Sequence, residues 1–73
     1  MSNEELKEAL VSRRPIILRL ASLGDLEYAY VSAIIYRTDA AGKIFVQAEC
    51  MDKCLHSVTV ADPRSIFFKE ETV

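Results

Sequence analysis

Tryptophan is absent from this chain, and glycine, proline and cysteine occur only twice each among its 73 residues. Two cysteines are too few for a small disulfide-stabilised scaffold. The uninterrupted apolar stretches hold only a few residues, whereas a membrane-spanning helix needs roughly 20. The N-terminus is acidic and lacks the basic and apolar regions of a signal peptide. We therefore expect a cytoplasmic protein with reduced thiols and no membrane partner.

An excess of basic residues is also missing, because the net charge is −2 and the pI is about 5.3. This charge argues against a dedicated binder of DNA backbones. Hydrophobic residues make up 51% of the chain and charged residues 27%, as in folded globular domains. A chain of this length buries only about 60% of the surface that its unfolded form exposes. We expect one small domain, residues 1–73, that gains stability from association.

The first segment predicts a short helix over residues 3–13. Ser2 and Glu5 match a capping box, in which each side chain bonds to the backbone of the other residue. Leu6 and Leu10 lie on one face and are expected to dock on the rest of the domain. Pro15 ends the helix, since its ring disfavours a helical conformation in the residue before it.

From Pro15 onward the pattern predicts five strands and one turn of 3₁₀ helix. The run from Leu26 to Arg37 is too long for an ordinary strand, and its alternation changes phase, which indicates a bent strand with a bulge. Val58 and Val60 are expected to face inward. The strands are expected at residues 16–20, 26–37, 44–51, 56–60 and 66–68, with the 3₁₀ turn at residues 62–65.

This order of elements resembles the SH3-like small barrels, and most of all the Sm-like branch that includes the bacterial Sm-like RNA chaperone. The resemblance lies in a helix ending at Arg13 and Arg14, an aliphatic strand after Pro15, a turn at Gly24, and the segment from Asp62 to Phe68. It implies an all-β fold, a five-stranded SH3-like or Sm-like barrel over residues 15–69, with the N-terminal helix across one opening and a 3₁₀ turn before the last strand. It also favours a bacterial source.

The family's RNA-binding motifs have no counterpart in this sequence. The second strand lacks the family's glycine and has Ala29-Tyr30-Val31 instead, and Val60-Ala61-Asp62-Pro63 replaces the Tyr-Lys-His segment before the last strand. No RNA-binding residue is therefore carried over. An Sm-like RNA-binding oligomer remains the alternative function, because outward aromatic rings beside cations can stack bases. The candidate contacts are Arg19, Tyr28, Tyr30, Arg37, Lys43 and Phe45, and cross-strand packing is the alternative role of the rings.

Cys50, Cys54 and His56 form the one cluster of potential metal ligands. Structural zinc needs four ligands, so Asp52 or a second chain would have to supply the last. The other interpretation is a core cysteine, a loop cysteine and a surface histidine, and we expect no metal and no cofactor. Cys54 and His56 are also spaced as a nucleophile and a base, but no third group orients them, so no enzymatic activity is predicted.

The last strand contains adjacent aromatic residues, Phe67 and Phe68. Because neighbouring side chains of a strand point to opposite faces, one ring must face away from the core in either register. Outward apolar groups on an edge strand favour an interface. We predict a non-enzymatic protein-binding or assembly module that forms homo-oligomers through this region, with a further protein partner that the sequence does not identify.

Overall fold

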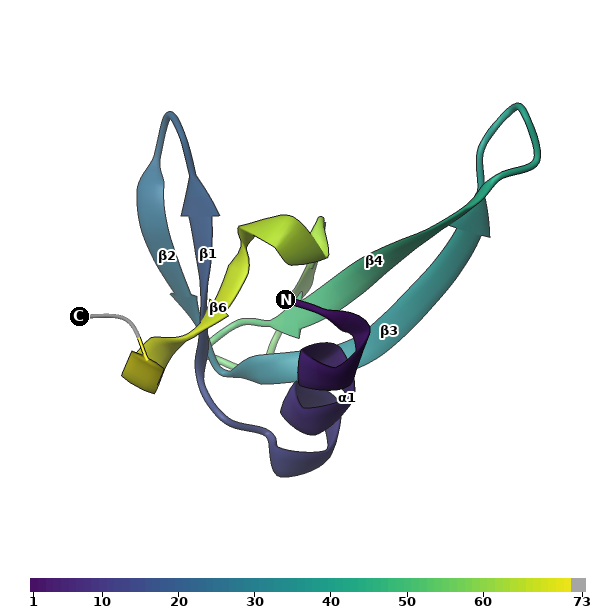
Figure 1. Cartoon of the computed structure of the whole chain (residues 1–73). Coiled ribbons are helices and arrows are strands. Elements are labelled where there is room, and N and C mark those ends of the chain that lie inside the picture. The colour runs from purple at the N-terminus through teal and green to yellow at the C-terminus, as the bar shows by residue number, and fades with distance from the viewer. Residues whose placement is uncertain (72–73) are drawn as a thin grey trace.

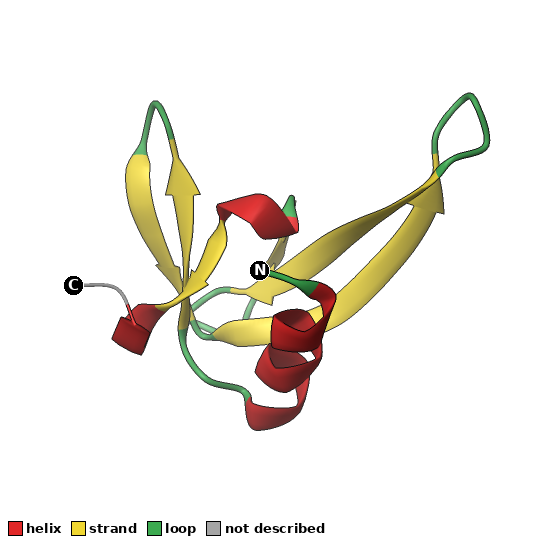
Figure 2. Cartoon of the chain, in the orientation of Figure 1, coloured by secondary structure: helices red, strands yellow, loops and turns green. Residues whose placement is uncertain are grey.

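The computed structural model describes residues 1–71, which form one helix, six strands and two short 3₁₀ helices (Figures 1 and 2). Their bounds are α1 (Asn3–Ser12), β1 (Ile16–Leu20), β2 (Gly24–Tyr28), β3 (Tyr30–Thr38), β4 (Ile44–Met51), β5 (Val58–Ala61), η1 (Pro63–Ser65), β6 (Ile66–Phe68) and η2 (Lys69–Glu71).

The predicted capping box of α1 is confirmed. The Glu5 N–H donates to Ser2 Oγ at 3.2 Å, and the Ser2 N–H donates to the Glu5 carboxylate at 2.9 Å. The helix ends at Ser12, one residue earlier than predicted, because Arg13 adopts a left-handed conformation with φ of 57°. Its N–H still donates to the Ala9 carbonyl, which closes the helix just before Pro15.

The predicted five-stranded barrel is wrong. Over residues 1–71 the strands form two three-stranded antiparallel sheets, with orders β2-β1-β6 and β3-β4-β5, and they do not close into a barrel. The reason lies in the run from Leu26 to Arg37, which is two strands instead of one bent strand. At Ala29 the chain leaves the first sheet, and the Ala29 N–H donates to the Met51 carbonyl of the second sheet at 2.8 Å. The helix of the predicted all-β fold was expected across one opening of the barrel, and it packs on β3 instead (Figure 1).

The expected bulge does occur, at the start of β3. The pairing register between β3 and β4 shifts between Val31 and Ala33. The side chain of Ser32, the residue in between, donates to the carboxylate of Glu49 at 2.7 Å. The bulge therefore reorients the strand while the buried Val31 keeps its place opposite Cys50.

One apolar core joins the helix to both sheets. It contains Leu6, Ala9, Ile16, Leu18, Val31, Ala48, Cys50, Ile66 and Phe68, all buried, with Leu10 and Leu20 packed against it. Ile17 is also buried, opposite Phe67 of β6.

The prediction that Val58 and Val60 face inward is wrong, because both side chains are exposed. Strand β5 pairs with β4 so that Thr59 lies opposite the buried Cys50 and Ala61 opposite the buried Ala48. The other two residues of β5 then point to the outer face. Alternation predicts that Val58 and Val60 share one face of β5. The pairing register with β4 determines which face that is.

We expect Leu6→Ala to destabilise the domain by about 2–5 kcal/mol, since it removes a filled core position on α1. Val11→Ala, on the exposed face of the same helix, should change the unfolding free energy by less than about 0.5 kcal/mol. Urea unfolding followed by circular dichroism measures both. Equal effects of the two substitutions would show that α1 is not docked through Leu6.

Candidate interaction surface

Two short strands form open edges of the two sheets. Among the described residues β5 pairs only with β4, and β6 pairs only with β1, so the outer side of each strand lies at an edge of its sheet. On β6 the Ile66 N–H donates to the Pro63 carbonyl, and the Ile66 carbonyl accepts from the N-terminal ammonium of Met1 at 3.4 Å. Neither strand contains a lysine or a proline, the residues that commonly protect edges. We call these two sides the β5 edge and the β6 edge.

The β6 edge carries an exposed aromatic ring. Ile66 and Phe68 are buried, whereas Phe67 between them points outward and is 38% exposed. Phe67 lies opposite Ile17 of β1, and the guanidinium of Arg19 lies 4.9 Å from its ring centroid. One of the two adjacent phenylalanines faces outward, as predicted. Phe67 lies at the surface and Phe68 lies in the core.

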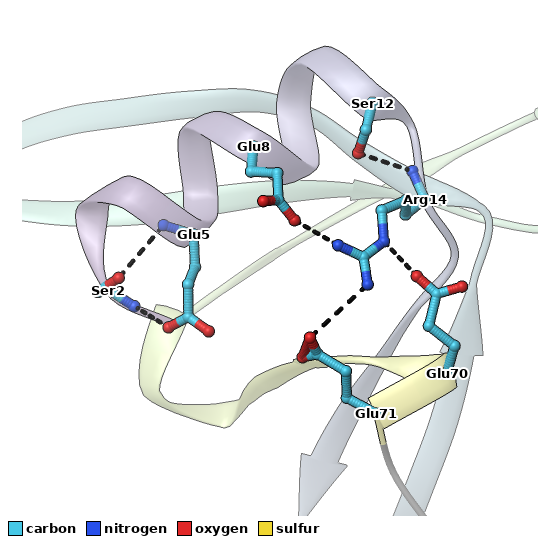
Figure 3. Close-up of polar contacts among 7 residues, drawn as sticks. All are labelled: Ser2, Glu5, Glu8, Ser12, Arg14, Glu70 and Glu71. Atoms are coloured by element: carbon cyan, nitrogen blue, oxygen red, sulfur yellow. Dashed lines mark hydrogen bonds and ion pairs between the residues drawn. The ribbon is translucent and has the colours of Figure 1, made fainter.

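The Arg14 side chain joins α1 to η2 (Figure 3), and its guanidinium lies over the buried ring of Phe68. The Arg14 guanidinium lies 3.8 Å from the ring centroid. It also pairs with Glu8 of α1, with Glu70, and with Glu71 at 3.7 Å. A cation held between a ring and several carboxylates fixes the direction in which β6 leaves the core.

The β5 edge is apolar as well. Val58 and Val60 are 43% and 42% exposed, and the intervening Thr59 bonds to the hydroxyl of Tyr28 at 3.2 Å. Sequence reasoning missed these valines because their spacing fits either face of a strand. The edges of β5 and β6 therefore both present apolar side chains to solvent.

The turn between β5 and β6 is held by a hydrogen-bonded cap. Asp62 accepts the N–H of Arg64 at 2.9 Å, as predicted for the start of the 3₁₀ helix η1, and Pro63 is buried. The Arg64 side chain also donates to this carboxylate at 2.8 Å. These side-chain and backbone hydrogen bonds from Arg64 lower the pKa of Asp62 to about 2.

The residues predicted for nucleic-acid contact do not meet at one place. Arg19 forms a two-pronged ion pair with Asp25, at 2.9 and 3.1 Å. Tyr28 bonds to Thr59, and the ring of Tyr30 lies beneath Arg13. The other three, Arg37, Lys43 and Phe45, lie on the β3–β4 hairpin.

The cluster of Cys50, Cys54 and His56 does not converge either. Within residues 1–71 no group of three acidic, cysteine or histidine side chains is placed to hold a metal. Cys50 is buried and Cys54 exposed, and neither is in a disulfide. Asp52, the suggested fourth ligand, accepts the His56 N–H at 3.0 Å and the Ser57 hydroxyl at 2.6 Å. Its oxygens organise the loop between β4 and β5.

Comparisons with protein-family models, curated proteins and solved structures find no match for this chain. In the part of the chain that the structure describes, no helix has the length and apolar character needed to cross a membrane.

We expect one fast-reacting thiol per folded chain. Burial raises the pKa of Cys50 to about 11, so this thiol is protonated and shielded at pH 8, whereas Cys54 is exposed. A disulfide reagent such as dithionitrobenzoate, added at pH 8, should modify one thiol at once and the second only in denaturant. Cys54→Ser should remove the fast phase, and a fast phase that survives this substitution would contradict the burial of Cys50.

We expect the cap at Asp62 to make stability fall in acid. The carboxylate contributes stability above its unfolded pKa of about 3.9, and the contribution is lost as the pH falls toward the folded pKa of about 2. Asp62→Asn keeps a good capping residue that does not titrate, so its melting temperature should depend less on pH between about 4 and 2. Equal slopes for the two proteins would show that the cap contributes nothing to this dependence.

Proposed function

We propose that the protein is a non-enzymatic assembly module whose copies associate head to tail, with the β6 edge of one copy packing against the β5 edge of the next. The observation that carries this proposal is the exposure of Phe67 on a short strand at the edge of its sheet. Packing would bury this ring against the exposed valines of β5. We further propose that the module acts in the cytoplasm, where its two thiols remain reduced.

The two edges complement each other in chemistry. Val58 and Val60 are exposed on β5, and Phe67 is exposed on β6. In the proposed contact Phe67 of one copy would lie against Val58 and Val60 of the other. Burial of these apolar groups supplies the driving force, at about 25 cal/mol for each Å² removed from water.

Head-to-tail pairing has a consequence for the size of the assembly. Each copy has one β5 edge and one β6 edge, so a dimer joined by one such contact still has one free β5 edge and one free β6 edge. In a closed ring every β5 edge contacts a β6 edge, whereas a rotation between copies that does not close gives a filament. A discrete mass above that of a dimer is therefore the expected state.

We expect Phe67→Glu to lower the mass in solution, because it places a charge in the contact between the edges. Multi-angle light scattering at micromolar concentration measures the mass. Leu23→Glu is the matched control, since Leu23 is 68% exposed in the turn between β1 and β2, away from both edges, and this substitution should leave the mass unchanged. Phe68→Glu should unfold the domain instead, because that ring is in the core.

A Phe67→Glu protein with the mass of the unaltered chain would overturn the proposal. The ultraviolet absorbance ratio of freshly purified protein adds a second readout. Nucleic acid that co-purifies with the unaltered protein and stays bound to Phe67→Glu would point to the alternative function of an RNA-binding oligomer.

A further inference from the structure

A second surface lies on the outer half of the β3–β4 hairpin, which projects away from the helix and from the other sheet (Figure 1). Strand β5 pairs with β4 only from Ala48 to Met51, so residues 35–47 form a two-stranded ribbon. We call these residues the arm. Val46 of the arm packs against the core, whereas Tyr36 and Ile44 nearer the turn are exposed. A two-stranded ribbon is only marginally stable in water on its own, so a contact with another chain would stabilise the outer end of the arm.

Both faces of the arm carry exposed apolar side chains. On one face Tyr36 is 60% exposed and Ile44 is 72% exposed, because nothing within the described chain covers this end of the hairpin. Thr38 of the same face and the neighbouring Arg37 complete the lining of an open groove beside them. Ile35 and Phe45 belong to the opposite face with Arg37, whose Nε–H donates to the Gln47 amide oxygen at 2.8 Å.

The backbone of β3 has an open side along the arm. The Asp39 N–H donates to the Lys43 carbonyl at 2.9 Å, so the backbone groups of Asp39 point toward the opposite strand. In an antiparallel ribbon successive residues alternate between pointing toward the partner strand and pointing away. Arg37 and Ile35 therefore bond to β4, and the N–H and C=O groups of Ile34, Tyr36 and Thr38 point outward.

We propose that this open side of β3 pairs antiparallel with the same side of a second copy, about a two-fold axis at Tyr36. In this register Tyr36 lies opposite Tyr36 of the second copy, and Ile34 lies opposite its Thr38. All three outward-pointing residues then exchange backbone hydrogen bonds. The two tyrosine rings meet as a cross-strand aromatic pair and fill the grooves beside Ile44.

The chain selects both this register and this partner. A shift of the axis to Arg37 would place two guanidinium groups directly opposite each other and leave one outward-pointing residue unpaired. A shift to Ile35 would also lose a backbone pair. With the axis at Tyr36, Arg37 instead faces Ile35 of the second copy, so the edge is complementary to itself. This contact uses neither the β5 edge nor the β6 edge, and it does not depend on their pairing.

The decisive experiment changes the charge at Ile35, the residue that faces Arg37 across the proposed contact. All variants are made in the Phe67→Glu protein, in which the head-to-tail contact is disrupted, and the dimer dissociation constant is measured by analytical ultracentrifugation up to millimolar concentration. Ile35→Glu should tighten the dimer by about threefold or more, because it forms two symmetric ion pairs. Ile35→Lys should weaken it by a similar factor, because it opposes like charges.

These substitutions distinguish a second copy from an acidic protein or a nucleic acid. An anionic partner on the arm would leave the dimer constant unchanged and would bind Ile35→Lys more tightly than Ile35→Glu. Dimer constants that move in the same direction for both variants, or not at all, would overturn the proposal. Circular dichroism melting curves of the two variants confirm that each remains folded.

Tyr36→Pro tests the backbone pairing itself. It removes an N–H that points away from β4, so the ribbon can stay paired while the dimer is lost. In the Phe67→Glu protein, amide exchange at Tyr36 should slow as the concentration rises, because the contact gives its N–H a hydrogen-bond partner. A Phe67→Glu protein that is monomeric at millimolar concentration would overturn the arm contact and leave the head-to-tail proposal standing. A Phe67→Glu protein of unaltered mass would overturn the head-to-tail proposal, and the Ile35 variants would still decide the arm contact.

Discussion

A single small core holds the helix and both sheets, and the chain is too short to build a second one. Leu6 of the helix, Ile16 and Ile66 of one sheet, and Val31 and Cys50 of the other are all buried there. In a domain of this length a large share of the apolar surface stays in contact with water. Every apolar group that cannot reach this core must therefore lie on the surface or at a contact with another molecule.

The surface groups occur where the chain moves away from the core. Phe67 alternates with two buried residues of β6, and Val60 lies on the face of β5 turned away from Cys50. Tyr36 and Ile44 lie beyond the last residues that β5 pairs with. Strand alternation and hairpin length thus place these side chains outside the core.

Local features could be predicted from the sequence because a few neighbouring residues determine them. The capping box at Ser2 and the 3₁₀ turn at Pro63 are both of this kind. The division of the long run at Ala29 could not be predicted, since it depends on a hydrogen bond to Met51, which is distant in sequence. For the same reason, the number of sheets and the outward face of β5 became known only from the register.

The two proposed contacts differ in symmetry, and this difference determines what they would build together. Pairing of the β6 edge with the β5 edge uses two different surfaces, so it propagates from copy to copy until a ring closes. Pairing of the arms through Tyr36 uses one surface twice, so it ends with two copies. A ring whose copies each present an arm would join a second ring through two-fold axes, which gives an assembly of dihedral symmetry. A domain with one small core would in this way bury part of its remaining apolar surface between copies.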